Sequence, residues 1–448
     1  MDVDKIQAII KKNGISTIRY EMPDVYGISH CRLFPAASFQ RRTTEGVKFS
    51  ISTLMSSDPQ GNLASGTGYG EEIGFGNCLA FPDLETFQVV PWAKSSARVL
   101  MNPTIDGQPV VGYPRYVARR QIARLNAVGY TLLSTNKYEF CVENAVERKP
   151  IFSGRNFGAT VRLPKVEGIL EPLCDYLPQV GYDILNMDTG YGPGQIGMSY
   201  RPAFGLKAAD TAYTFRTSIK EIAMRNSHIA SFMTKPYNDG NGSSGHFIHS
   251  LWDPKRKHPM LFDKDHPTGL SKNGRHWVAG ILSHVPGLAV LMCPTINCMK
   301  RYVPNEQAPV NASWGYDNRS TAVRVRVMGD RGTFIENRLP GSGCNPYIVM
   351  AATIAAGIDG IANKLPLPPP VKGDVMDEKS LPPLTASIPN NIHDALSALV
   401  ADTVLCDALG DEFINCFLSL KQQEDQLMTK AMGTGHKNWE YDYYFEYM

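Results

Sequence analysis

KRYVPNEQAPVNASWGYDNRSTAVRVRVMGDRGTFIENRLPGSGCNPYIVM, residues 300–350, places several arginines beside Gly and Pro turns and close to Glu336. A guanidinium group can bind phosphate or carboxylate through two parallel hydrogen bonds, so this set could form an anion clamp. Surface arginines and glutamates also form solvated ion-pair faces, which is the more common arrangement. Residue types alone leave both interpretations open for Arg301, Arg319, Arg324, Arg326 and Arg338.

The sequence around this stretch mixes helical and strand-like patterns. PYIVMAATIAAGIDGIANK (346–364) predicts an apolar core helix opened by Pro346. AVLMCPTIN (289–297) and TAVRVRVMG (321–329) are typical of strands. Further upstream, strand-like YTLLSTNKYEFCV, YDILNM and IGMSYRP alternate with helical stretches near 166–180 and 208–226. The pattern predicts an α/β or α+β protein.

Two domains are expected. Residues 15–100 consist of short strand-like runs separated by Gly, Pro, Asn and Asp, which favours a small sheet domain. PRYVARRQIARLNAVG (114–129) predicts a helix, and we expect the second domain to begin near residue 109. The predicted domains are therefore 1–108 and 109–448, with a Pro-dense surface segment at 365–390.

Composition narrows the classes of partner. The 448 residues carry 45 Lys+Arg and 43 Asp+Glu, a net charge of +2 without a basic tract, which argues against nucleic acid and anionic membrane as main partners. No uncharged apolar run approaches the length of a membrane span. Nine cysteines without a CxxC pair indicate reduced thiols, and MDVDKIQAIIKKNG does not resemble a secretion signal. These features predict a cytoplasmic protein that binds small molecules or proteins.

Shorter motifs are weaker signals. The glycine clusters GTGYG (66–70) and GYGPG (190–194) complete neither GxGxxG nor a P-loop. His246 and His249 lie three residues apart, and in isolation we interpret such residues as hydrogen-bonded structural histidines.

Several longer motifs follow one another along the chain, and their order is more specific than any one of them. They are PDLETFQVVPW, YEFCVEN, GPGQ, KP before GNGSSGH, SLWD, CPTINCMKRY, APVNASWGYDNRS, IENRLPGSGCNPY and AATIAAGIDGI. From about residue 15 onward this order resembles the class I glutamine synthetase family. The resemblance implies an α+β protein with an N-terminal β-grasp domain and a large C-terminal domain around a curved antiparallel sheet. It also implies a homo-oligomer, a dodecamer of two stacked hexameric rings with active sites between subunits.

The resemblance implies ATP-dependent ligase chemistry, in which the γ-carboxylate of glutamate is phosphorylated and ammonia or an amine displaces the phosphate. Divalent Mg²⁺ or Mn²⁺ and arginines stabilise the charge of the transferring phosphoryl group. The two metal sites of the family use five glutamates and one histidine.

At the first metal position only Glu139 matches a ligand. Gly197 stands where the glutamate after GPGQ is expected, and Thr189 or Gly190, depending on register, replaces the glutamate before it. A single carboxylate does not supply the oxygen ligands that Mg²⁺ or Mn²⁺ requires, so we expect this site to be lost.

At the second metal position His246 and Glu336 match, while Lys137 replaces the remaining glutamate. Two like charges repel one another by about 4 kcal/mol at ~4 Å and an effective dielectric near ~20, and a divalent ion doubles this repulsion. We expect the lysine to replace the cation and to pair with Glu139 or Glu336.

The ammonia side is also altered. Gln307 replaces the flap glutamate, Glu306 could act only if the loop shifts by one residue, and Ser50 replaces an aspartate contributed across the subunit interface. Ile248 and Phe334 replace basic residues of the family. No catalytic residue is therefore assigned.

The anion-binding arginines remain. Arg301 and Arg338 match arginines that bind glutamate, and Arg319 and Arg324 match arginines that bind phosphate.

Runs such as PRYVARRQI, NASWGYDN and FEYM resemble a branch of the family, from the vertebrate lens, that is regarded as non-enzymatic. We therefore expect a catalytically silent, oligomeric structural or chaperone-like protein, with cytoskeletal proteins among its candidate partners and without bound Mg²⁺, Mn²⁺ or ATP. The alternatives are an active ligase for ammonia or another amine with a rebuilt metal site, and a glutamate or nucleotide sensor.

Overall fold

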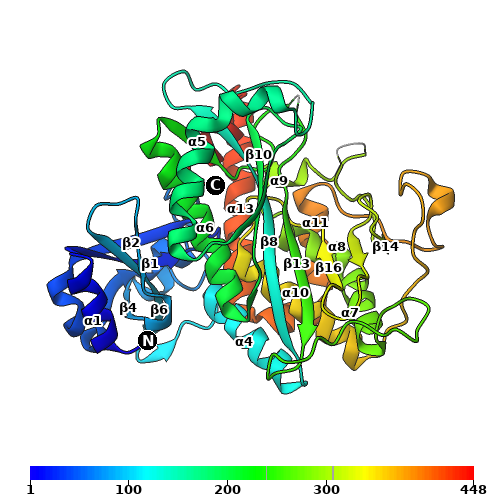
Figure 1. Ribbon diagram of the computed structural model, residues 1–448, viewed down its shortest axis with the longest axis horizontal. Coiled ribbons are helices and arrows are strands. Elements are labelled where there is room, and N and C mark those ends of the chain that lie inside the picture. The colour runs from blue at the N-terminus through cyan, green and yellow to red at the C-terminus, as the bar shows by residue number, and fades with distance from the viewer. Residues whose placement is uncertain (239, 305–306) are drawn as a thin grey trace.

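The computed structural model describes residues 1–238, 240–304 and 307–448 and has two β-sheets (Figure 1). The smaller sheet has the order β2-β1-β6-β4-β3, with β5 and β7 also paired to β6. Strand β1 runs parallel to β6, and the other pairs are antiparallel. Its strands are β1 (Thr17–Pro23), β2 (Ser29–Pro35), β3 (Val47–Ser50), β4 (Asn77–Pro82), β5 (Gln88–Val89), β6 (Ser96–Ile105) and β7 (Gln108–Pro109).

The larger sheet has the order β14-β15-β16-β13-β8-β10-β9 in the described part of the chain, with β11 and β12 also paired to β8. Only β14 and β15 pair in parallel among these strands, so the expected curved antiparallel sheet and the α+β class are confirmed. Its strands are β8 (Thr131–Asn144), β9 (Ile184–Thr189), β10 (Gln195–Tyr200), β11 (Ala203–Phe204), β12 (His228–Ser231), β13 (Gly245–Trp252), β14 (Trp314–Tyr316), β15 (Val323–Arg326) and β16 (Phe334–Asn337).

Helices pack beside both sheets. The predicted helices at 114–129, 166–180, 208–226 and 346–364 are confirmed with small changes in their ends. The helices are α1 (Val3–Lys12), α2 (Phe39–Glu45), α3 (Ile51–Met55), α4 (Pro114–Ala127), α5 (Leu163–Tyr176), α6 (Leu206–Arg225), α7 (Lys272–Ser283), α8 (Val285–Met292), α9 (Ile296–Met299), α10 (Pro346–Ala362), α11 (Ile392–Ala401), α12 (Thr403–Leu409), α13 (Asp411–Gly433) and α14 (Trp439–Tyr444).

The strand prediction for AVLMCPTIN was wrong, because this run spans the end of α8 and the start of α9. Pro286 lies in the first turn of α8, and the helix is buried nearly all round. A short, wholly apolar run fits a buried helix as well as a buried strand, so periodicity could not separate the two.

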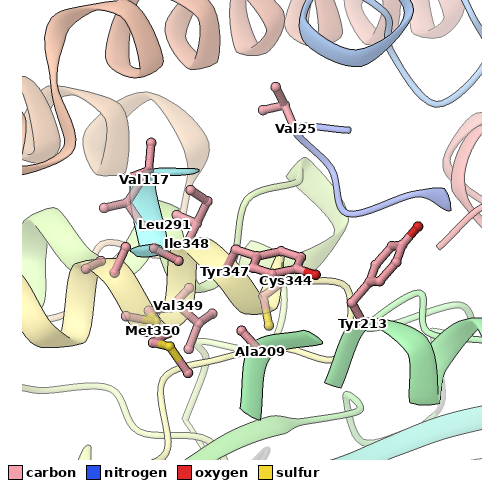
Figure 2. Close-up of a cluster of buried hydrophobic side chains, with 14 of the residues drawn as sticks. Val25, Val117, Ala209, Tyr213, Leu291, Cys344, Tyr347, Ile348, Val349 and Met350 are labelled. Atoms are coloured by element: carbon pink, nitrogen blue, oxygen red, sulfur yellow. The ribbon is translucent and has the colours of Figure 1, made fainter. Parts of the chain in front are cut away.

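The hydrophobic core is continuous between the two sheets. Helix α10 is buried over most of its length, and Figure 2 shows Tyr347 and Ile348 close to Val117 of α4 and Tyr213 of α6. Val25, from the loop after β1, belongs to the same cluster. The boundary at 108/109 remains a prediction, because the core joins residues from both sides of it.

Two further findings concern membranes and thiols. No helix in the described ranges is both long enough and apolar enough to span a membrane. All nine cysteines are free thiols.

Candidate functional site

The candidate site lies on one face of the larger sheet, and strand register brings its residues together. Directly opposite residues of antiparallel strands point to the same face. Lys137 of β8 lies opposite His246 of β13. Glu336 of β16 lies between Ile248 of β13 and Arg324 of β15. Because residues two apart on a strand share a face, these pairs form one polar surface.

This surface lines a cavity of about 360 Å³. Five of its side chains are basic and three are acidic, so the cavity favours anions overall. Its lining residues are Lys137, Glu139, Phe157, Asn186, Asp188, Tyr191, Gln195, Asn241, Gly242, Ser244, His246, Arg301, Gln307, Arg319, Arg324, Glu336 and Arg338.

On one side of the cavity, His246 and Arg324 both form hydrogen bonds to the buried carboxylate of Glu336. His246 Nδ1 lies 2.9 Å from Glu336 Oε1, and Arg324 donates to Glu336 Oε2 at 2.7 Å. Burial opposes the charge of Glu336, but the hydrogen bond from His246 and the nearby arginines hold its pKa well below the usual value. Burial lowers the pKa of His246 to about 4, so the ring is neutral at pH 7 and its Nδ1–H donates to the carboxylate.

The expected pairing of Lys137 was wrong. Within the described ranges, Lys137 makes no ion pair with Glu139 or Glu336. Arg324 supplies the cation for Glu336, because register places it directly opposite on β15. The Glu139 carboxylate turns instead toward Ser244, whose backbone N–H and hydroxyl both donate to it at 2.8 Å.

The other side of the cavity holds an acidic residue that the sequence analysis missed. Asp188 lies opposite Gly197 on β9, and Glu139 lies opposite Gly197 on β8. Asp188 therefore faces the cavity, while Thr189 points to the opposite face and is buried. Gly190 is packed tightly against Gln195. Strand alternation could have identified Asp188, since Asn186 and Asp188 share one face.

The residues do not fit the two-metal site of the family. Gly197 provides no ligand between Glu139 and Asp188, and Glu336 is already neutralised by Arg324. No group of three or more His, Cys, Asp or Glu residues in the described part of the chain could hold a metal ion. Mg²⁺ prefers octahedral oxygen coordination, which these side chains do not supply.

The arginines predicted to bind substrate line the cavity together. Arg301 is 2% exposed and donates to the carbonyl groups of Arg338 and Leu339, while its Nε has no partner among the described residues. Arg338 donates to the carbonyl groups of Thr321 and Gln307, and burial lowers its pKa to about 10. Arg319, in contrast, is exposed at the cavity edge. The set can hold an anion.

The residues predicted for the ammonia side are dispersed. Gln307 lines the cavity and is exposed, whereas Glu306 lies outside the described residues. Ser50 lies in the smaller sheet, where its hydroxyl caps α3 by accepting from Thr53 N–H at 3.4 Å. Its predicted role across a subunit interface remains a prediction.

The other departures from the family have structural roles. Ile248 shares the site face with Glu336, and the guanidinium of Arg326 lies 5.6 Å from the ring centre of Phe334. His249 is buried and accepts a hydrogen bond from Trp277 Nε1 at 3.0 Å, which confirms it as a structural histidine.

The site thus lies on the face of a curved, mainly antiparallel sheet, beside a smaller N-terminal sheet, in an arginine-rich cavity. Residues 111–444 match the family model for the glutamine synthetase catalytic domain. The chain belongs to the glutamine synthetase family.

The chain is similar in sequence to lengsin, to glutamine synthetases and to a glutamate–methylamine ligase. Lengsin of Homo sapiens is 34% identical over 432 residues, covering 94% of this chain and 82% of lengsin. Glutamine synthetase of Thermotoga maritima is 32% identical over 456 residues, covering 99% of each chain. Glutamate–methylamine ligase of Methyloversatilis universalis is 31% identical over 465 residues, covering all of both chains.

The fold also matches a solved structure. The structure described as apo GmaS without ligand superposes with a TM-score of 0.83 at 25% sequence identity, covering 94% of this chain and 96% of GmaS. The expected glutamine synthetase fold is thereby confirmed.

Proposed function

We propose that this chain is a catalytically silent member of the glutamine synthetase family that acts as a homo-oligomeric binding or scaffold protein. The observation that carries the proposal is the rebuilt metal region. Gly197 and Lys137 stand where the family resemblance places glutamate ligands, and Arg324 neutralises Glu336. Phosphoryl transfer in this family relies on divalent metal to stabilise developing charge, so a site without that metal loses its main electrostatic contribution.

The arginines support retained binding. Arg301 and Arg338 are assigned to a carboxylate, and Arg319 and Arg324 to a second anionic group such as phosphate. Mg²⁺, Mn²⁺ and ATP are family cofactors that this chain is proposed not to use. Assembly into stacked hexameric rings, a cytoplasmic location and cytoskeletal partners belong to the same proposal.

An assay of phosphate release tests whether the protein lacks ligase activity. Purified protein is incubated with ATP, glutamate and ammonia, with either Mg²⁺ or Mn²⁺, while light scattering after size-exclusion chromatography reports its assembly. We expect a homo-oligomer with no glutamate-dependent phosphate release above background. Turnover within tenfold of an ordinary enzyme rate of about 10 s⁻¹ would overturn the proposal.

An active amine ligase is the second candidate. The specific observation in its favour is Asp188, which adds a carboxylate to the cavity beside Glu139. The similarity to glutamate–methylamine ligase supports an amine other than ammonia. On this account methylamine gives turnover, and Lys137→Glu changes it little. On the silent account, neither Lys137→Glu nor another single reversion restores turnover.

A further inference from the structure

The Pro-dense segment that follows α10 runs past β14, at the edge of the larger sheet (Figure 1). Residues 365–372 read LPLPPPVK and contain four prolines. All of these residues are described by the structure, and they lie outside its helices, strands and turns. Proline fixes φ near about −65°, so such a run favours the polyproline II helix, which repeats every three residues. We call residues 365–372 the proline ridge.

Contacts with the rest of the chain recur along the proline ridge with the same period. His276 Nδ1 donates to the carbonyl group of Leu365 at 2.8 Å. Three residues further on, Trp314 Nε1 donates to the carbonyl group of Pro368 at 2.8 Å. After another three residues, the N–H of Val371 donates to the carbonyl group of Trp314 at 2.8 Å, and Val371 is buried. Leu365, Pro368 and Val371 therefore form one edge of a polyproline II helix, and this edge is fixed to the protein.

A second edge of the proline ridge faces solvent. Pro366, Pro369 and Lys372 each follow one of the bonded residues, and all three are exposed. Leu367 and Pro370, on the third edge, are half-buried. The ridge thus presents two proline rings and one ammonium group in a row, about 9 Å apart along the helix axis, on a backbone that the protein already holds extended.

The charge of the proline ridge and its flanks is positive. Lys364 precedes the ridge and Lys372 ends it, both are exposed, and residues 360–373 contain no acidic residue. A partner of complementary charge carries an acidic side chain at the end of its binding groove. Grooves lined by aromatic side chains recognise polyproline II segments, because such segments are already ordered before they bind. The ridge therefore fits a groove that is both aromatic and acidic.

We propose that the proline ridge is a docking site for an SH3 domain. The aromatic groove of that domain packs on the rings of Pro366 and Pro369, and an acidic side chain beside the groove pairs with Lys372. The bonded edge already holds the ridge extended, so docking orders few additional residues and costs little conformational entropy. None of the described residues 365–372 lines the arginine-rich cavity, so this inference goes beyond the proposed function.

Binding of isolated SH3 domains to the whole protein tests the proposal. The oligomeric protein is immobilised for biolayer interferometry and titrated with a panel of purified SH3 domains that carry acidic residues beside the groove. A WW domain, which also binds polyproline II segments, is the comparison. We expect at least one SH3 domain to bind with a Kd tighter than about 100 µM. Its affinity should fall as NaCl rises from about 50 to about 500 mM, because Lys372 contributes through its charge.

Substitutions on the exposed edge identify the docking residues. Pro366→Ala combined with Pro369→Ala should weaken SH3 binding at least about tenfold, since two rings lose their burial in the groove. Lys372→Glu should weaken it severalfold and remove its dependence on NaCl. Pro383→Ala is the matched control and should leave binding unchanged, because Pro383 is an exposed proline of the same Pro-dense segment but lies in a turn. Size-exclusion chromatography checks that each variant retains the wild-type assembly.

The proposal is overturned if no SH3 domain of the panel binds, if the double proline variant binds as tightly as the wild type, or if Pro383→Ala weakens binding as much. Tighter binding of the WW domain than of every SH3 domain would also overturn it. Lys372→Glu, at an exposed position, gives a second answer even if the double variant does not fold. The phosphate-release assay reports separately on the proposed function, so the two failures are distinguishable.

Discussion

The two sides of the cavity differ in how their carboxylates are compensated. Glu336, which is 4% exposed, is bonded to both His246 and Arg324. Glu139 and Asp188 are only partly buried, and their hydrogen-bond partners among the described residues are hydroxyl or amide groups. A buried charge needs a partner inside the fold, whereas a charge that contacts solvent does not. The carboxylate of Glu336 is therefore neutralised inside the fold, whereas those of Glu139 and Asp188 remain partly exposed in the cavity.

The largest expected effect on stability comes from removing Arg324, the cation that pairs with Glu336. Arg324→Ala leaves Glu336 buried with only neutral His246 as its partner, so we expect a loss of about 3 kcal/mol in the free energy of unfolding. Urea denaturation measures this loss. Arg326→Ala is the control, because Arg326 is more exposed and lies 3.5 Å from Asp317, and its change should stay below about 1 kcal/mol. Equal losses in the two variants contradict the account.

Adding a carboxylate to the open side should create metal binding. Gly197→Glu places a third carboxylate between Glu139 and Asp188, where the backbone leaves room for a side chain. We expect Mn²⁺ to stabilise this variant by about 2.7 kcal/mol at a concentration ~100 times its Kd. Thermal unfolding with and without Mn²⁺ measures the change.

The matched control for the gain in Mn²⁺ binding is Gly197→Gln, because glutamine has nearly the same shape as glutamate but carries no charge. Mn²⁺ should leave its unfolding temperature unchanged. A Mn²⁺ response of equal size in both variants would show that the added carboxylate does not coordinate the ion.

The pH dependence of stability tests the burial of His246 beside Glu336. Burial lowers the pKa of His246 to about 4, while an unfolded histidine titrates near ~6.5. Between these values the unfolded chain binds a proton that the folded chain does not, so stability falls as pH drops from about 6.5 to about 4. We expect His246→Asn to remove on the order of 2 kcal/mol of this loss. Urea denaturation of both proteins across this range measures the difference, and parallel curves would contradict the assignment.

The smallest expected effect on stability comes from changing Asp188, on the side of the cavity that holds Glu139 and Asp188. Asp188→Asn removes a partly exposed charge that pairs with no basic residue in the described ranges, so the free energy of unfolding should change by less than about 0.5 kcal/mol. Urea denaturation beside Glu336→Gln, which disrupts the buried network, gives the comparison. A loss for Asp188→Asn as large as that for Glu336→Gln would remove the distinction between the two sides.

The sequence predicted much of the fold and most of the cavity lining. Pro346 and the apolar run after it predicted α10, and the ordered motifs predicted the curved sheet. AVLMCPTIN was misassigned because an apolar run of that length has no informative periodicity. Gly197, Lys137, His246 and Glu336 could be assigned because each lies within or beside a recognisable motif.

The remaining features of the site depend on contacts between distant strands. Arg324 pairs with Glu336 because β15 and β16 are in register, and the sequence positions alone did not reveal that pairing. Asp188 was not predicted, because the motif match assigned the ligand position to Thr189 or Gly190. Alternate residues of β9 face the cavity, and Asp188 is one of them whereas Thr189 is not. Strand register, rather than residue type, determined these two outcomes.

Anomalous diffraction from crystals of the wild-type protein grown with Mn²⁺ tests the central claim most directly. The account predicts no Mn²⁺ peak in the cavity, with Arg324 still bonded to Glu336 and open space above Gly197. A Mn²⁺ peak coordinated by His246 and Glu336, with Lys137 and Arg324 turned away, would contradict it.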